Sequence, residues 1–240
     1  MKAFKTLFTV LVLFLGFPAI AVRLPRTVTQ DEFKTLISTL AFGHTTKVMR
    51  SAEAYPSFPG FKIALETPLV YAGDLQEMGD GSASLPIVIP APRLTLTKGF
   101  GYDLEASFNI STQELLETMA GIGFLAKWTF LDEKNSFLSS SLFTSYTRLN
   151  GFNHTFSGNN FEVGVLASQD WVRIKPYLGL GLLLASAKVA PSISPSNQTG
   201  IAFSPHLFMG VEIELVMNMT FQMDFTSLVP NGSLALGYCF

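Results

Sequence analysis

Charged residues occur at alternate positions in several segments of this chain, a spacing that places them on one side of a β-strand. The residues concerned are Asp103, Glu105, Arg173, Lys175, Glu212, Glu214 and Asp224. If the strands enclose a narrow interior, we expect Arg173 and Lys175 to face Glu212 and Glu214 of the neighbouring strand as a ladder of ion pairs. Such a ladder would fill and stabilise that interior. If the interior is open, the excess of acidic residues would favour cations.

A serine and a histidine in the same alternation offer a second kind of chemistry. Ser204 lies two residues before His206, and Glu212 follows on the same side of the segment. A serine, a histidine and an acidic residue form the constellation of many hydrolases. The sequence therefore keeps a hydrolase as one alternative. It carries no metal or cofactor motif, and we expect no cofactor.

The elements that must position these residues are strands, because the apolar period is two from Gly60 to the C-terminus. Leu94 and Leu96 alternate with Arg93 and Thr95, for example, and the other segments follow the same rule. Charged residues make up only 14% of the chain, against about 25% in an average soluble domain. Many apolar faces are also longer than those of a soluble β-sandwich, and the segments have the length of tilted strands that cross a membrane, about 9–11 residues.

The predicted connections alternate between long and short. The long ones are 71–90, 111–118, 150–159 and 190–199, and brief turns separate the remaining strands. Outer-membrane barrels show this asymmetry, with short periplasmic turns and longer outer loops. We predict an all-β fold over residues 59–240: a closed antiparallel transmembrane β-barrel of ten strands, or of eight or twelve if a segment is merged or split. An even number of strands would place both termini in the periplasm.

The first 58 residues differ from the rest. Residues 1–21 have a basic head, an apolar core and small residues at Ala19 and Ala21, as in a signal peptide cleaved after Ala21. Residues 22–58 would form a periplasmic extension. Within it, Thr29 and Glu32 have the spacing of a capping box and predict an amphipathic helix over 30–42. That helix would either plug the barrel or lie at its periplasmic side.

The last strand carries the most specific resemblance. Phe240 ends the chain, Tyr238 and Leu236 alternate with it, and Ser233 lies seven residues before the end. With these residues the chain resembles small outer-membrane β-barrel proteins of Gram-negative bacteria, including uncharacterised proteobacterial ones. The resemblance implies an outer-membrane location, contact with outer-membrane lipid, and a C-terminal signal, formed by Ser233, Leu236, Tyr238 and Phe240, that the barrel assembly machinery reads.

These observations favour a non-enzymatic role, either structural or in the passage of small solutes, as in a porin. Two alternatives stay open: an outer-membrane lipid hydrolase or deacylase using His206, and a surface-binding protein acting through the loops 71–90 and 190–199. The formal net charge of −2 argues against nucleic-acid binding, which requires a basic face. The sequence does not indicate an oligomeric state.

Overall fold

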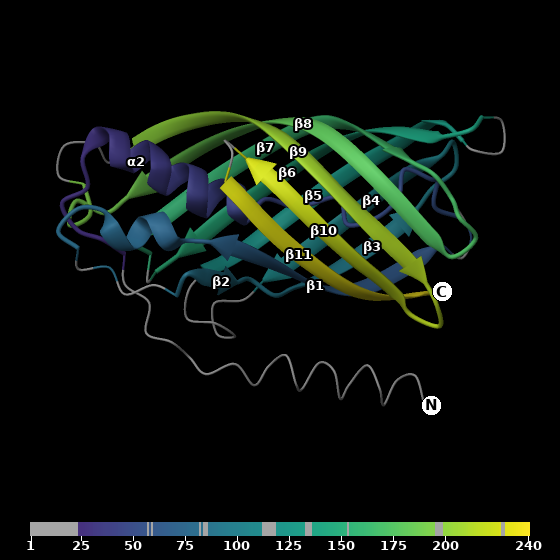
Figure 1. Ribbon diagram of the computed structural model, residues 1–240, viewed down its shortest axis with the longest axis horizontal. Coiled ribbons are helices and arrows are strands. Elements are labelled where there is room, and N and C mark those ends of the chain that lie inside the picture. Colours follow the sequence, from purple (N-terminus) through teal and green to yellow (C-terminus); the bar gives the residue numbers. More distant parts are fainter. Residues whose placement is uncertain are drawn as a thin grey trace.

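The chain folds into a closed antiparallel barrel of ten strands, as the alternation predicted (Figure 1). The computed structural model describes residues 24–240 except 57, 59, 82, 84–85, 112–118, 133–135, 153, 195–198 and 227–228. The predicted signal peptide and part of the predicted loops therefore lie outside the described residues. Each wall strand pairs with the next along the chain, and the last, β11, pairs with the first, β1, which closes the barrel.

The wall strands are β1 (Phe61–Tyr71), β3 (Arg93–Gly99), β4 (Leu104–Ser111), β5 (Met119–Leu131), β6 (Ser139–Gly151), β7 (Phe156–Ser168), β8 (Ile174–Val189), β9 (Thr199–Glu214), β10 (Asn218–Thr226) and β11 (Val229–Cys239). A short additional strand, β2 (Val88–Pro90), pairs with the end of β1. Before the barrel come the helix α2 (Gln30–Ile37) and the π-helical turn η1 (Ser38–Phe42), and the 3₁₀ turn η2 (Gly73–Glu77) follows β1.

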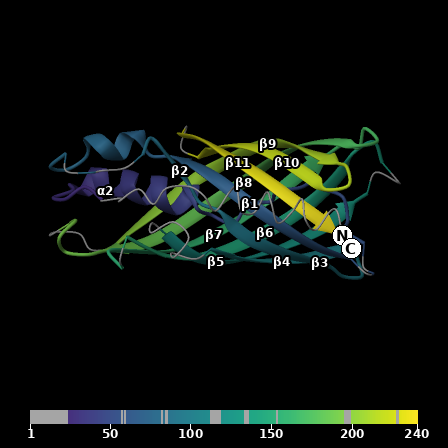
Figure 2. The same ribbon diagram turned by 90° about the horizontal axis from the view of Figure 1, so that it is seen from below.

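The two ends of the barrel differ. One end, here called the loop end, carries α2, η2 and the described parts of the connections 72–87, 152–155 and 190–198 (Figures 1 and 2). The other, here called the turn end, carries the connections 100–103, 132–138, 169–173 and 215–217 together with Phe240. The expected contrast in length is only partly present, because β6 and β7 pair as far as Gly151 and Phe156. Connection 152–155 is therefore shorter than 132–138, and the predicted long loop 150–159 is wrong. Polar residues on both sides of the turn instead continue the pairing between β6 and β7.

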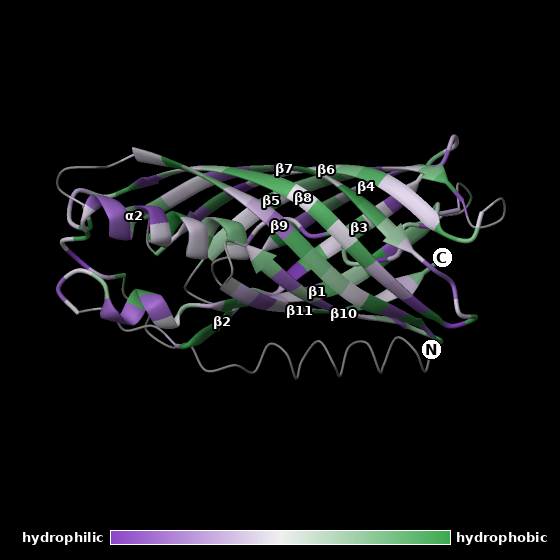
Figure 3. Cartoon of the chain, turned by 45° about the horizontal axis from the view of Figure 1, so that its top comes forward, coloured by the Kyte–Doolittle hydropathy of each residue, from purple (hydrophilic) through white to green (hydrophobic). Residues whose placement is uncertain are grey.

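Burial in the wall is inverted relative to a soluble protein. The large apolar side chains of Phe124 and Leu180 point outward and remain 52% and 56% exposed, whereas the inward-facing Lys127 and Glu162 are each 1% exposed. The alternation is visible along the strands in Figure 3. Soluble monomers rarely expose a continuous apolar surface of more than a few hundred Å², so the outside of this barrel suits a hydrocarbon environment. Among the described helices none is long and apolar enough to cross a membrane.

The helix predicted over 30–42 is confirmed: α2 and η1 together cover it. Its start is the expected capping box, since the Glu32 amide donates to the Thr29 hydroxyl over 3.4 Å and the Thr29 amide donates to the Glu32 carboxylate over 2.8 Å. Hydrogen bonds from the Thr29 hydroxyl, the Thr29 amide and the Gly79 amide lower the pKa of Glu32.

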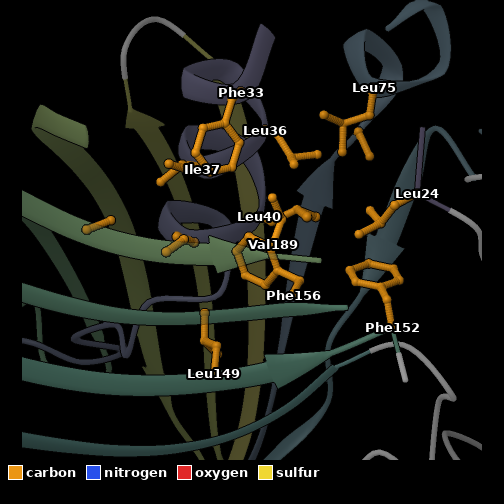
Figure 4. Packing of buried hydrophobic residues seen from close by; sticks show 14 of the residues in the cluster. Leu24, Phe33, Leu36, Ile37, Leu40, Leu75, Leu149, Phe152, Phe156 and Val189 are labelled. Atoms are coloured by element: carbon orange, nitrogen blue, oxygen red, sulfur yellow. The ribbon is translucent and has the colours of Figure 1, made fainter. Parts of the chain in front are cut away.

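The apolar side of this helix packs into the loop end of the barrel. Phe33, Leu36, Ile37 and Leu40 are buried there in a cluster with wall residues such as Phe156 (Figure 4). The helix thus lies at the end opposite Phe240 (Figure 1). Of the two positions given for this helix, the structure has its apolar side at a mouth of the barrel, and this mouth is the one opposite the C-terminus. At this end the helix covers an apolar cluster that the ends of several wall strands assemble.

Thr29→Ala is expected to destabilise the start of α2 by about 1 kcal/mol, because the Thr29 hydroxyl no longer accepts from the Glu32 amide or donates to the Glu32 carboxylate. Hydrogen exchange at the Phe33 amide, which donates to the Thr29 carbonyl over 2.9 Å, measures the change. Since the pKa of Glu32 is lowered in the folded protein, the contribution of Glu32 is complete above its unfolded pKa and is lost as the pH falls through its folded pKa. Thr35→Ala is the matched control. Equal protection in both variants at neutral pH would contradict a role for the capping box.

Candidate functional site

The residues that follow the helix enter the barrel and fill its lumen. Residues 43–55, here called the plug segment, run from Gly43 beside Val70 at the loop end to Tyr55, whose hydroxyl donates to the Phe61 carbonyl over 3.0 Å at the turn end. Every residue from 41 to 52 is buried. A barrel of eight strands is just filled by its own side chains, and a wall of ten strands leaves room for this one additional stretch of chain.

Wall side chains take the place of a backbone ladder for the plug segment. The amides of Thr46, Ser51 and Ala52 donate to the side chains of Thr147, Glu212 and Ser168 over 2.8, 3.0 and 2.9 Å. Carbonyl oxygens of the segment accept from wall side chains as well. The pairs are Thr45 with Arg93, Met49 with Thr220, Ser51 and Glu53 with Lys127, and Ala52 with Thr129. Because buried backbone groups need partners, these contacts make the lumen specific for an extended segment at this position.

Each charged side chain of the plug segment meets an opposite charge on the wall. Lys47 Nζ lies 2.6 Å from Asp224 Oδ2, Arg50 Nη1 lies 2.9 Å from Glu105 Oε2, and Lys175 Nζ lies 2.5 Å from Glu53 Oε2. The Lys47 and Asp224 side chains are 2% and 1% exposed. Attraction between such buried charges is largely offset by the loss of their hydration. The pairs therefore fix the position of the segment more than they stabilise the barrel.

His206 lies within the same network and not in a catalytic arrangement. Its Nδ1 lies 2.6 Å from Glu162 Oε1, and its Nε2 lies 3.1 Å from Asp224 Oδ1. An ionised carboxylate only accepts hydrogen bonds, so between two ionised carboxylates both ring nitrogens donate and neither is left to take a proton from Ser204. The Ser204 hydroxyl donates to the Pro205 carbonyl over 2.8 Å. The geometry therefore favours a structural cation at His206.

The predicted ladder residues are divided between two places. Glu105, Lys175, Glu212 and Asp224 are buried in the lumen. Lys175 lies opposite Glu212 in the register of β8 and β9, as expected, but its Nζ lies 2.9 Å from Glu214 Oε1, and Glu212 Oε1 forms its ion pair with Lys62 at 3.5 Å.

Arg173 and Asp103 do not belong to the ladder. Both are exposed at the turn end, outside the paired length of their strands. The alternation was extended too far there, because both residues belong to turns and Asp103 adopts a positive φ of 56°.

The residues of the predicted C-terminal signal occupy the strand that closes the barrel. Leu236 pairs with Leu65 of β1, and the Phe240 amide donates to the Phe61 carbonyl over 2.8 Å. The rings of Tyr238 and Phe240 are 5.0 Å apart, whereas Ser233 faces inward with its hydroxyl 3.4 Å from Asp224 Oδ2.

Sequence reasoning missed the plug residues Lys47, Arg50 and Glu53. They lie between the predicted helix and the first predicted strand, in a stretch without periodicity for which no element was predicted. The sequence did contain a signal. Three charged residues at intervals of three stand among small and polar residues, directly before strands whose inward positions are rich in charge.

Within the described ranges, no group of three or more His, Cys, Asp or Glu residues is arranged to hold a metal ion. No family model matches the chain, and no curated protein matches its sequence. Solved structures of similar form include the outer membrane protein Ail of Yersinia pestis, with 14% identity, 75% of this chain and 98% of that chain covered, and a TM-score of 0.38. The KdgM porin shows 10% identity, 75% and 99% coverage and a TM-score of 0.38. Neisserial surface protein A shows 14% identity, 74% and 94% coverage and a TM-score of 0.32. At these values the similarity is one of barrel form and carries no argument about function.

Proposed function

We propose that this protein is an integral outer-membrane β-barrel through which small solutes pass when the plug segment shifts within the lumen. The apolar outside and the charged inside support the membrane location. The turn end, which carries the C-terminus, would then face the periplasm, and the loop end with α2 would face outward.

One observation carries the proposal: the lumen is filled by a separate segment, whose backbone and charged side chains are held to the wall by hydrogen bonds and ion pairs. Water can replace hydrogen bonds and ion pairs when the segment shifts, so displacement has a moderate free-energy cost. An interior whose only task was structural would be more stable with an apolar filling, since a buried ion pair is often no better than a hydrophobic replacement.

The charges also indicate which solutes the passage would prefer. Displacement separates Lys47 from Asp224 and Arg50 from Glu105, which removes one of the cations paired with each of these two wall carboxylates. Rings of acidic side chains favour cations in narrow pores. We therefore expect small cations to pass more readily than anions of equal size.

Deletion of residues 22–58 is expected to convert a protein that conducts rarely into one that conducts continuously. Planar-bilayer recordings should show at least a tenfold higher mean conductance for the deletion variant, with a preference for K⁺ over Cl⁻. Heat-modifiable migration on a gel is the control that the variant still forms a barrel. A folded variant without conductance would exclude a role in passage and leave the structural role.

A further inference from the structure

The two flanks of the plug segment meet the wall through different chemistry. On the dry flank, Val48 and Ala52 pack against apolar side chains of β5 to β9. These are Leu125, Phe143, Leu166, Tyr177 and Phe208. The rings of Phe143 and Phe208 are 5.7 Å apart, edge to face. This flank excludes water.

On the opposite, wet flank, two small cavities lie between the segment and β1, β3 and β4, and the smaller one also reaches Gly121 of β5 and Thr147 of β6. The larger, about 20 Å³ of space open to the centre of a water molecule, lies between Thr46–Arg50 and the wall. The smaller, about 10 Å³, lies beside His44 and Arg93. Asn109 lines both cavities, so they are neighbours along the segment. About 10–15 Å³ in this measure suffices for one water molecule.

Buried polar atoms without a hydrogen-bond partner among the described residues gather around these cavities. In the larger cavity they include Thr95 Oγ1, Glu105 Oε1 and Arg50 Nε. Arg50 and Glu105 are close enough for an ion pair, yet their hydrogen-bonding capacity is unmet. Such groups in a native interior call for ordered water.

Among the described residues, the smaller cavity is also bordered by buried polar atoms that lack a hydrogen-bond partner. His44 Nδ1 lies 2.8 Å from the Leu40 carbonyl and therefore donates, which makes Nε2 of the neutral ring an acceptor. Arg93 Nη2 is a donor without a partner among the described residues, as His44 Nε2 is an acceptor without one. One water molecule between them would accept from Arg93 and donate to His44.

We infer that ordered water fills both cavities, and that this hydrated wet flank is the route of solute passage while the plug segment stays attached to the dry flank. The second part rests on the proposed function. The segment is held at the loop end by the buried α2 and at the turn end by β1. It therefore spans the lumen in either state and can only move sideways. Separation along the wet flank lets water replace the polar partners of Thr45, Thr46 and Arg50, whereas separation along the dry flank exposes apolar surface.

Two disulfide tethers test the route in the full chain with Cys239→Ser. The wet tether joins Thr46→Cys to Asn109→Cys, whose native side chains are 3.0 Å apart. The dry tether joins Ala52→Cys to Ser168→Cys, a contact of 2.9 Å between the Ala52 amide and the serine hydroxyl. Each protein is recorded in a planar bilayer before and after reduction, so that it serves as its own control.

The oxidised wet tether is expected to lower open probability at least tenfold, with recovery on reduction, and the oxidised dry tether to change it less than twofold. Loss of opening with the dry tether, or full opening with the wet tether, would overturn the inference while leaving the proposed function intact. A folded deletion variant that does not conduct would instead overturn the proposed function itself. The water is tested separately by a high-resolution crystal structure. Density within hydrogen-bond distance of Arg93 Nη2 and His44 Nε2 is expected, and a dry cavity would also overturn the inference.

Discussion

Lys47→Met is expected to raise the open probability of the barrel in a planar bilayer by about a hundredfold. The substitution keeps most of the side-chain volume but leaves Asp224 without its partner from the plug segment. Removing one member of a buried ion pair costs about 3–5 kcal/mol. The lower value applies here, because His206 and Gln222 still donate to Asp224. Each step of about 1.4 kcal/mol corresponds to a factor of ten in an equilibrium constant. The population of the state with the plug segment in place, relative to the displaced state, therefore falls by roughly two orders of magnitude.

Lys34→Met is the matched control, since it breaks an ion pair of the same chemistry at the surface. Lys34 Nζ lies 3.6 Å from Asp31, and the two side chains are 65% and 96% exposed. Exposed pairs contribute about 0–1 kcal/mol, so conductance should not change measurably. If Lys47→Met behaved like Lys34→Met, the ion pair with Asp224 would not hold the plug segment in place.

Gly123→Ala is expected to displace the plug segment without altering any charge. A Cβ atom at this position of β5 would overlap the Thr46 hydroxyl and lie 2.6 Å from Asn109 Oδ1. Overpacking of this kind costs about 1–3 kcal/mol, and here the segment that must move is the plug. The Thr46 amide donates to Thr147 over 2.8 Å, so its hydrogen exchange should accelerate about tenfold or more.

Gly158→Ala is the corresponding control on β7. The nearest atoms to a Cβ there are 3.5 Å away, which is ordinary contact. Exchange at Thr46 should match that of the unmodified protein. An unchanged rate in Gly123→Ala as well would mean that the wall, and not the plug segment, adjusts to the added methyl group.

The strands, and the side of the wall to which each residue points, were predictable from the sequence. Each wall residue meets either hydrocarbon or the lumen, so residues suited to the two environments alternate along a strand. The helix was predictable from Thr29 and Glu32, since a capping box is local. Its location was not, because the apolar cluster that receives it is assembled from strands distant in sequence, including Leu183 of β8 and Phe156 of β7.

The plug segment could not be predicted for a related reason. It has no regular structure of its own, and its amides bond to side chains more than a hundred residues away, such as Thr147 and Glu212. The predicted ion pair of Glu212 with Lys175 was wrong for the same reason. Lys175 lies directly opposite Glu212 in the ladder, yet its amine reaches Glu53 and Glu214, because the plug segment changes which charges are within reach.

The position of α2 beyond the filled lumen constrains the order of folding. The chain passes from α2 at the loop end through the lumen to β1 at the turn end, so it is threaded through its own barrel. A helix with its side chains is about 10–12 Å wide, and the plug segment alone already fills the lumen. The formed helix could therefore not pass through the closed barrel. We expect the barrel to close around a segment already in place, at the seam between β1 and β11, which joins strands distant in sequence. In refolding, protection of the Thr46 amide should not lag behind the pairing of Leu65 with Leu236.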